Sequence, residues 1–549
     1  MRPTDEMFRA ALAGHATRVE RYRSGALTDE QFRPIRLGYG LYYQLDHTSH
    51  MQRIKLPGGL LTADQAECVA AIAEEFGRDI IHVTTRQDVQ LHWIPLEQVI
   101  AIYERLHAVG ITTRGACADS IRNVTGCYHA GALPGEPFDV TPYLWAVHEY
   151  SLFHPLNLTL PRKFKIAFAS CGGDCVQAPV NDIAFFPKAR DGRLGFAVHA
   201  GGGLGSQPFL AKPVRRFVPR EDILLLTEAI VRVQHRMGER KNRHKARMKY
   251  VVKNLGLERF IAEIDAEMER VERECGAALR DETAEVVASF RQPEPAHPGR
   301  TLPATAESGR AHWVRTNVFA QKQDGYFGVT VQLPLGDCTA AQLRALASLA
   351  REHGNGTLRT SNDQNFYLPW IPGDRVATVY RCLEEIRLAA PDALHVTDVT
   401  SCPGADYCSL AVSRSMGIAA SIRAHLLGQN GNVESLGVFR IKISGCPNSC
   451  GQHHIGDIGL TGMSLKEKDG RESPHYSLLV GGSVGEDTGV VGQRLVGRYP
   501  ERSVPGVIAA LTEYYRSQRH AGEPFRAFVG RIGTKALSEV AQQAAGTVH

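Results

Sequence analysis

Apolar and polar positions alternate along the chain as short strands followed by amphipathic helices, and this pattern occurs twice. Residues 40–77 read as a strand, a Leu-Pro turn, a threonine N-cap and an amphipathic helix, and residues 324–354 repeat that order. The further matching pairs are 81–95 with 358–372, 120–131 with 396–408, 161–175 with 439–450, and 195–205 with 476–485. This duplication predicts an α+β fold of two pseudo-two-fold related units, and their interface is the expected place for a large cofactor.

The same pattern divides the chain, whose 549 residues are too many for one core. Residues 213–272 have the apolar spacing of helices, whereas residues 289–310 are rich in proline, alanine and glycine and lack periodicity, which is typical of a linker. The predicted segments are an N-terminal extension (1–39), a first repeat (40–210), a helical connection (211–288), a linker (289–310), a second repeat (311–488) and a C-terminal helical segment (489–549).

Composition narrows the function classes. A hydrophobic content of 43% and a charged content of 22% are typical of a soluble globular protein, and a net charge of +5 is too small to predict a nucleic-acid partner. No apolar run approaches the roughly 18 residues that cross a bilayer, and charges occupy the place of a signal peptide's apolar region. We therefore expect a cytoplasmic protein without a membrane partner, whose twelve cysteines serve as reduced thiols and metal ligands.

Four cysteines in the second repeat are spaced as metal ligands. Cys402 and Cys408 form a C-x5-C pair, Cys446 and Cys450 form a C-x3-C pair, and the segment between the pairs reads as a helix followed by a strand. Zinc usually takes C-x2-4-C knuckles, whereas an iron–sulfur cube accepts irregular spacings. The spacing favours a [4Fe–4S] cluster and leaves a structural zinc site as the alternative.

The first repeat keeps three cysteines at the matching places. These are Cys127, Cys171 and Cys175, with Leu133 where the fourth ligand should fall. Because such clusters normally take four cysteines, the three are interpreted as a relic in preference to a second cluster.

The flanking residues carry a family resemblance. SCPGADYC (401–408) and KISGCPNSCGQHHIGDIGL (442–460) resemble the paired cluster motifs of the sirohaem-dependent sulfite and nitrite reductases, and the resemblance extends over roughly residues 40 to 500. It implies two cofactors, sirohaem and a [4Fe–4S] cluster, with Cys450 bridging the cluster to the sirohaem iron. The implied cluster ligands are Cys402, Cys408, Cys446 and Cys450.

The cations of the first repeat fit the same resemblance. Sirohaem carries eight carboxylates, so its pocket must supply several arginines and lysines. On a strand, Lys163 and Lys165 point to one face and repel each other unless an anion lies between them. The resemblance implies a catalytic, substrate-binding set of Arg53, Arg122, Lys163 and Lys165, and cofactor contacts from Arg86, Gln90, Arg162, Lys249, Asn448 and Cys450.

Three further residues attract attention. His453 and His454 follow the bridging cysteine, and we expect them to support the cluster loop or to lie on the surface, not to bind metal. Cys117 could be modified, as in some relatives, but a plain buried thiol is the simpler expectation.

The resemblance predicts six-electron reduction of sulfite to sulfide in sulfur assimilation. Sulfite is preferred because its third oxygen and larger charge gain more from four cations than nitrite does. The alternatives are a nitrite reductase that forms ammonia, a cobalamin-pathway precorrin enzyme of the same fold, and a zinc-stapled binding module. We recognise no flavin or ferredoxin domain in the sequence, so the expected partner is a separate donor, either ferredoxin or a flavoprotein.

Overall fold

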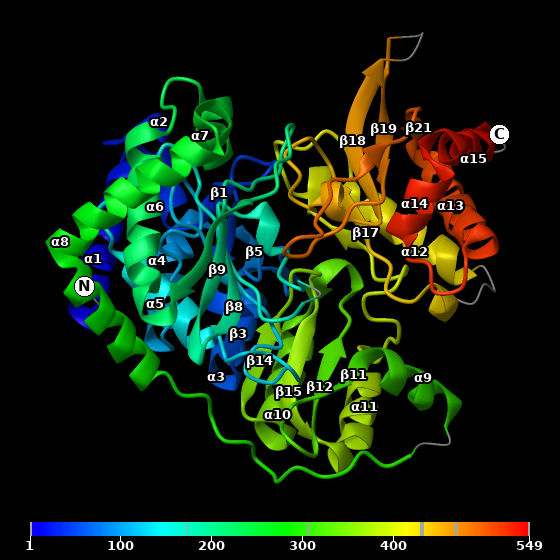
Figure 1. Ribbon diagram of the computed structural model, residues 1–549, viewed down its shortest axis with the longest axis horizontal. Helices are drawn as coiled ribbons and strands as arrows, with labels where there is room; N and C mark the ends of the chain where they lie inside the picture. Colours follow the sequence, from blue (N-terminus) through cyan, green and yellow to red (C-terminus); the bar gives the residue numbers. More distant parts are fainter. Residues whose placement is uncertain (1–2, 173, 305–306, 429–432, 467–469, 547–549) are drawn as a thin grey trace.

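The computed structural model describes residues 3–172, 174–304, 307–428, 433–466 and 470–546. Within this part of the chain, the strands form four sheets, two from each repeat, with helices packed around them (Figure 1). The predicted linker, 289–310, includes residues 305 and 306, which lie outside the described ranges. The four sheets and the helices around them form the duplicated α+β architecture that the sequence predicts.

The first sheet of each repeat is built by the same sequence of elements. The threonine N-caps are present as predicted, because Thr62 and Thr339 each form a capping box with a glutamine three residues later. The first of these sheets has the order β1-β2-β5-β4-β13, and the second has the order β11-β12-β15-β14-β3. Their elements are β1 (Leu41–Tyr43), β2 (His50–Ile54), β3 (Leu60–Thr62), α3 (Ala63–Phe76), β4 (Ile81–Val83), β5 (Val89–Ile94) and α4 (Val99–Ala108), then α9 (Ser308–Asn317), β11 (Val318–Ala320), β12 (Tyr326–Val331), β13 (Asp337–Cys338), α10 (Ala340–His353), β14 (Thr357–Thr360), β15 (Phe366–Pro372) and α11 (Val376–Glu385).

The repeats exchange one strand each. Strand β3 of the first repeat pairs with β14, where Leu61 lies opposite Leu358, and strand β13 of the second repeat pairs with β4, where Asp337 lies opposite His82. Helices α3 and α10 pack against each other, and one apolar core extends under both sheets. Neither sheet is complete without the other repeat, so the two are held as one body.

The second sheet of each repeat places the cysteines. The orders are β10-β9-β8-β7-β6 and β20-β19-β18-β17-β16, and in both the first three strands along the chain run parallel. Cys127 follows β6 and Cys402 follows β16 at the carboxyl ends of equivalent strands. The strands are β6 (Thr125–Gly126), β7 (Ile166–Phe168), β8 (Ile183–Arg190), β9 (Arg193–Ala200), β10 (Lys212–Pro219), β16 (Thr400–Ser401), β17 (Ile441–Ser444), β18 (Ile458–Lys466), β19 (Glu472–Val480), β20 (Gln493–Arg494) and β21 (Tyr499–Pro500).

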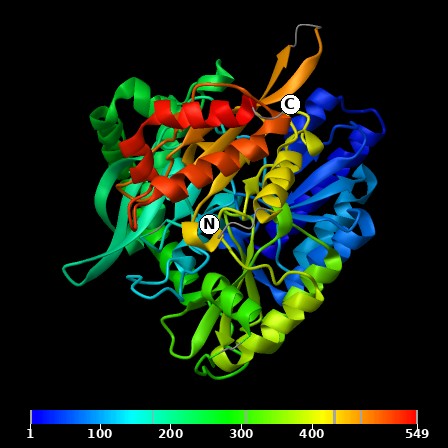
Figure 2. The same cartoon turned by 90° about the vertical axis from the view of Figure 1, so that its right-hand side faces the viewer.

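The remaining helices cover the outer faces. Helices α1, α2 and α5 to α8 lie on one side of the molecule and α12 to α15 on the other, and the β18–β19 hairpin projects from the body in both views (Figures 1 and 2). Two expectations were wrong: residues 213–219, predicted as helical, belong to strand β10, and the predicted C-terminal helical segment, 489–549, begins with strands β20 and β21, which pair with β19. No helix in the described ranges is long and apolar enough to span a membrane. The helices are α1 (Asp5–Arg23), α2 (Asp29–Gly38), α5 (Thr141–Leu152), α6 (Ile223–Met237), α7 (Met248–Leu255), α8 (Leu257–Ser289), α12 (Ser415–Gly428), α13 (Val504–Gln518), α14 (Phe525–Ile532) and α15 (Thr534–Gly546).

Candidate functional site

The four cysteines of the second repeat lie in two tight loops that follow β16 and β17. Helix α12 and strand β17 separate the two pairs, as the sequence predicts. A Cβ on Gly451 would lie 1.8 Å from the carbonyl oxygen of Ile443, and one on Gly404, where φ is +58°, would lie 2.1 Å from Ser415 Oγ. Only glycine allows the backbone to pass this close to the neighbouring strands.

Backbone amides surround the sulfur atoms of these loops. The N–H of Gly445 donates to Cys402 Sγ at 3.3 Å, and the Asn448 N–H interacts with the Cys446 sulfur. Burial raises the pKa of both thiols, so without a ligand they stay protonated at neutral pH. Four cysteines in tight loops, with amide N–H groups at their sulfur atoms, supply the ligands and hydrogen bonds that a [4Fe–4S] cluster takes.

The cations of the first repeat are placed by segments of both of its sheets and by a buried phenylalanine. Arg53 lies in β2, and Lys163 and Lys165 flank Phe164 in the extended segment that precedes β7. The Phe164 side chain is buried in the core of the second sheet, and Phe164 forms a parallel bridge with Ile121, next to Arg122. Because side chains alternate along extended backbone, both lysines turn away from the core toward one side.

Two arginines of this set are held in place by neighbouring oxygens. With its amide oxygen turned toward Arg53, Gln90 accepts from Nη2 at 2.7 Å and from Nε at 3.2 Å. The guanidinium of Arg122 donates to the carbonyl oxygens of Ala118, at 2.5 and 3.1 Å, and Ala116, at 3.3 Å. Both side chains are therefore fixed without a carboxylate that neutralises them fully; the nearest to Arg53 is Asp88, at 3.9 Å.

The two repeats meet at this point, with cations on one side and Cys450 on the other. Desolvation lowers the pKa of Lys163 to about 7 and lowers that of Lys165 well below its usual value. Neighbouring guanidinium groups push both pKa values further down, whereas Cys450 acts in the opposite direction on both lysines. Cys450 also raises the pKa of Arg53, so it lies close to the predicted substrate set.

Three predicted cofactor contacts already have protein partners. Arg86 Nη1 donates to Asn181 Oδ1 at 2.8 Å. Arg162 forms an ion pair of 2.9 Å with Asp119. Lys249 Nζ donates to the carbonyl of Leu204 at 3.0 Å, and so fastens the glycine-rich loop at 201–205. The roles of these residues toward a cofactor remain predictions.

The sequence prediction did not include Lys55, which lies in the same cluster. Its side chain is buried, its Nζ has no hydrogen-bond partner among the described residues, and desolvation lowers its pKa to about 7. Lys55 follows Arg53 by two positions, so the period of two that placed Lys163 with Lys165 also indicated Lys55. Arg247 was missed as well; it forms a buried ion pair of 2.7 Å with Asp182, whose carboxylate also accepts the N–H of Lys165.

The cluster of positive charge between the repeats shows whether the site suits sirohaem. Within the described chain, Arg247 and Asp182 form an ion pair here, and six further cations gather against one carboxylate, Asp88. Buried cations without counter-ions are costly, so a polyanionic ligand would stabilise the cluster. A macrocycle with several carboxylates meets this need. The six cations are Arg53, Lys55, Arg86, Arg122, Lys163 and Lys165.

The remaining candidates lie close to the two loops. His453 and His454 are buried, so the surface interpretation was wrong, and His454 Nδ1 is 2.9 Å from Ser449 Oγ in the cluster loop. Desolvation lowers the pKa of both histidines, which keeps them neutral at pH 7. Cys117 is fully buried beside Tyr42, and it interacts with Arg53 of the substrate set.

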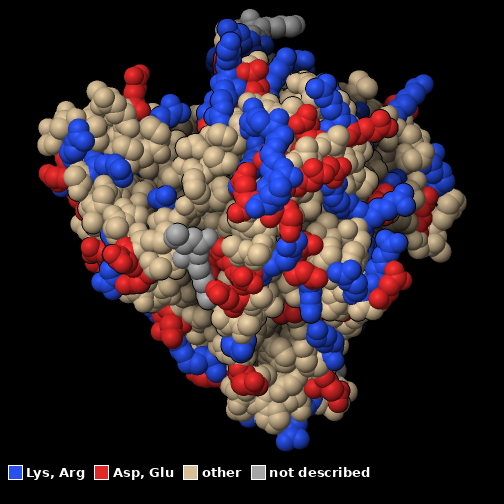
Figure 3. Space-filling view, turned by 60° about the vertical axis from the view of Figure 1, so that its left-hand side comes forward, with Lys and Arg blue, Asp and Glu red and all other residues tan. Residues whose placement is uncertain are grey.

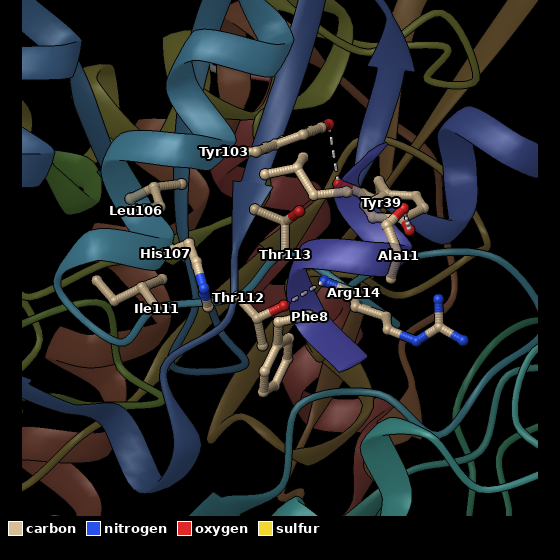
Figure 4. Close-up of a pocket in the computed structure, with 11 residues that line it drawn as sticks. Phe8, Ala11, Tyr39, Tyr103, Leu106, His107, Ile111, Thr112, Thr113 and Arg114 are labelled. Carbon is tan, nitrogen blue, oxygen red and sulfur yellow. Dashed lines mark hydrogen bonds between the residues drawn. The ribbon is translucent and has the colours of Figure 1, made fainter. Parts of the chain in front are cut away.

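A cavity elsewhere in the first repeat is too small to compete with this site. It is lined by Phe8, Tyr39, Tyr103 and Arg114, among others, and its volume of about 30 Å³ holds no more than a few water molecules (Figure 4). On the face shown in Figure 3, basic and acidic side chains are interspersed. The cation cluster between the repeats is therefore the feature that calls for an anionic ligand.

Comparison with known proteins agrees with this geometry. Residues 43–109 and 319–386 match the nitrite/sulfite reductase ferredoxin-like half domain, and residues 117–272 and 393–548 match the nitrite and sulphite reductase 4Fe-4S domain. The matched segments are the two copies of the duplicated unit.

Individual relatives are similar over most of their length. The assimilatory ferredoxin-dependent nitrite reductase of Haloferax mediterranei is 31% identical over 89% of this chain and 83% of its own. Sulfite reductase [ferredoxin] 2 of Mycolicibacterium paratuberculosis is 29% identical over 81% of this chain and 76% of its own. The structure of the Mycobacterium tuberculosis NirA protein superposes with a TM-score of 0.78 at 25% identity, covering 95% of this chain and 94% of that one.

Proposed function

Because the chain belongs to the nitrite and sulfite reductase family, we propose that it reduces nitrite to ammonia with electrons from ferredoxin. The observation that carries the proposal is the position of Cys450 opposite Lys163 and Lys165. An electron-supplying centre and a cationic anion site then meet at one interface. Nitrite replaces sulfite as the preferred substrate because the relative with the higher identity and the longer match is named a nitrite reductase.

The family's cofactors are sirohaem and a [4Fe–4S] cluster, and the residues of this chain fit both. Cys402, Cys408, Cys446 and Cys450 would hold the cluster, and the cations of the first repeat would pair with the carboxylates of the macrocycle. When bound, the two groups supply electrons one at a time and an iron that binds the anion. Lys55 is the strongest candidate for an additional carboxylate partner, because its Nζ is buried and has no partner in the described chain.

The chain's own task is to hold the anion and to deliver protons. Arg53 is fixed by Gln90 and Arg122 by backbone carbonyls, so both guanidinium groups suit binding and orientation of the nitrite oxygens. Desolvation lowers the pKa of Lys163 to about 7, so its Nζ can take up and release protons near neutral pH, and the pKa of Lys165 is lowered as well. Reduction of nitrite to ammonia consumes several protons, and two adjacent amines can pass them from solvent to the oxygens that leave as water.

Sulfite is the second candidate. The relative from Mycolicibacterium paratuberculosis is named a sulfite reductase, and a doubly charged oxyanion gains more from four cations than nitrite does. The same residues would perform the same tasks on either anion.

The test is turnover of the purified enzyme, loaded with both cofactors, with reduced ferredoxin. The proposal predicts ammonia in stoichiometric amounts from nitrite, and slower turnover when a flavoprotein replaces ferredoxin. Oxidation of ferredoxin without ammonia formation, or a clear preference for the flavoprotein, would contradict it. A Lys245→Met variant, which changes an exposed lysine outside the site, serves as the control and should behave as the native enzyme.

A further inference from the structure

The structure brings three cysteines of the first repeat into one close group. Cys127 follows β6, and Cys171 and Cys175 lie in the loop after β7. The three Sγ atoms all lie within 4.8 Å of one another, and those of Cys127 and Cys175 are 3.0 Å apart. Cys127 and Cys175 are buried, and Cys171 is half-buried. If these cysteines were only remnants of a lost cluster site, nothing would hold their three sulfur atoms close together.

The spacing of these sulfurs distinguishes a single ion from a cluster. Thiolates that bind one tetrahedral Zn²⁺ at about 2.3 Å lie about 3.8 Å apart, which is the scale of this group. A [4Fe–4S] cube binds each cysteine to a different iron, so its cysteine sulfurs lie farther apart. In the ranges that the structure describes, the four cysteines of the second repeat do not form a close group of this kind, whereas Cys127, Cys171 and Cys175 do. The cysteines at the two equivalent places in the duplicated unit thus differ in the spacing of their sulfur atoms.

The surroundings supply a hydrogen bond and positive charge to the group. The Cys175 N–H donates to Cys171 Sγ at 3.3 Å. Three thiolates and a divalent ion together carry one negative charge. The buried Arg359 can balance it, since its guanidinium donates to the Cys127 carbonyl at 3.4 Å, and Arg440 interacts with Cys175 from another side.

A cavity lies near the group, on the side of His129. Leu133, which stands where a fourth cysteine is expected, lines a cavity of about 330 Å³ together with His129 and Tyr367. The ring of His129 is close enough to Cys171 for the thiolate to influence its pKa. A water molecule, or His129 after a change of rotamer, would complete a tetrahedral shell.

We propose that Cys127, Cys171 and Cys175 bind a single thiophilic metal ion of the Zn²⁺ type, separate from the iron–sulfur cluster. The ion ties the end of β6 to the loop after β7. Strand β6 is in turn linked to the turn that carries Arg86. The adjacent residue, Gln87, forms two hydrogen bonds of 2.9 Å with Gly126 of β6. The site is thus structural.

The experiment is metal analysis of the purified holoenzyme produced in medium that contains zinc. We expect about one zinc per chain in addition to iron, and X-ray absorption at the zinc edge should show three sulfur neighbours at about 2.3 Å and one lighter ligand. Cys171→Ser should lose at least nine-tenths of the zinc while it keeps its iron and visible spectrum. The matched control is Cys382→Ser, which changes a half-buried thiol outside the group and should retain the zinc.

Several results would overturn the site. These are iron as the sole bound metal together with no thiolate charge-transfer band after addition of Cd²⁺, zinc that persists in Cys171→Ser, four sulfur neighbours at the zinc edge, or a Cys127–Cys175 disulfide in the native protein. If Cys171→Ser does not fold, X-ray absorption at the zinc edge of the native protein still tests the site, because it counts the sulfur atoms bound to zinc.

Discussion

The Thr85 hydroxyl donates a hydrogen bond of 2.7 Å to the backbone carbonyl of Cys450, across 365 positions of the sequence. Gln452 returns a contact, because its Nε2 donates to the Thr85 carbonyl at 3.3 Å. Thr85 lies in the turn between β4 and β5, beside Arg86, and Cys450 closes the cluster loop. The turn of the cationic repeat is therefore fastened to the cysteine that the family resemblance assigns to both cofactors.

Thr85→Val removes this hydroxyl at nearly constant volume. We expect a loss of about 1 kcal/mol in the free energy of unfolding and a severalfold fall in turnover, with iron content unchanged. Thr85→Ser keeps the donor and is the control. Equal turnover of the valine and serine variants would show that the contact does not position the two repeats.

Cys450→Ser tests the bridging assignment. A hydroxyl is a poor ligand for iron, so the variant should lose cluster iron and the visible bands of the haem. Iron analysis and the absorption spectrum measure both losses. A variant with native spectra and native activity would refute the assignment of Cys450 to the cofactors.

Lys163→Met and Lys165→Met should leave the cofactors bound and slow anion reduction. Loss of one charge-assisted contact in the transition state costs about 3 kcal/mol, or about a hundredfold in kcat/KM. An artificial electron donor isolates this step from ferredoxin binding. If both variants turn over at rates near those of Lys245→Met, the two lysines do not act on the substrate.

Anion affinity should depend on pH through Lys163. The anion binds to the protonated amine, and desolvation places the pKa of Lys163 near 7 before the anion binds. Above that pKa, binding must include proton uptake, so the nitrite dissociation constant should rise with pH, by up to tenfold per unit; below it, this lysine contributes no pH dependence. Carboxylates of a bound macrocycle move the midpoint upward without changing the sign. Lys163→Arg keeps its charge and should flatten the profile, and a native profile in that variant would exclude Lys163 as the titrating group.

The sequence predicted what depends on spacing along the chain. The duplicated α+β fold is confirmed, because capping boxes such as that of Thr62 and strand–turn–helix patterns are local. The exchange of β3 and β13 was not predictable, since strands of two or three residues carry no periodicity and His82 meets Asp337 across 255 positions.

Charge partners show the same limit. The sequence places Arg162 and Lys163 on opposite faces of an extended segment. Only the folded structure shows that Asp119 lies beside Arg162. Only the folded structure shows that Lys55 Nζ is buried with no hydrogen-bond partner among the described residues. The three thiols of the first repeat were recognised by position. Whether they converge depends on the parallel order of β6 and β7, which only the structure gives.

The most direct test of the proposed function is the ratio of the specificity constants for nitrite and sulfite, measured on one preparation of holoenzyme with reduced ferredoxin as the sole donor. We expect kcat/KM for nitrite to exceed that for sulfite by at least tenfold, and Cys450→Ser to abolish both activities. A ratio that favours sulfite would contradict the proposed function.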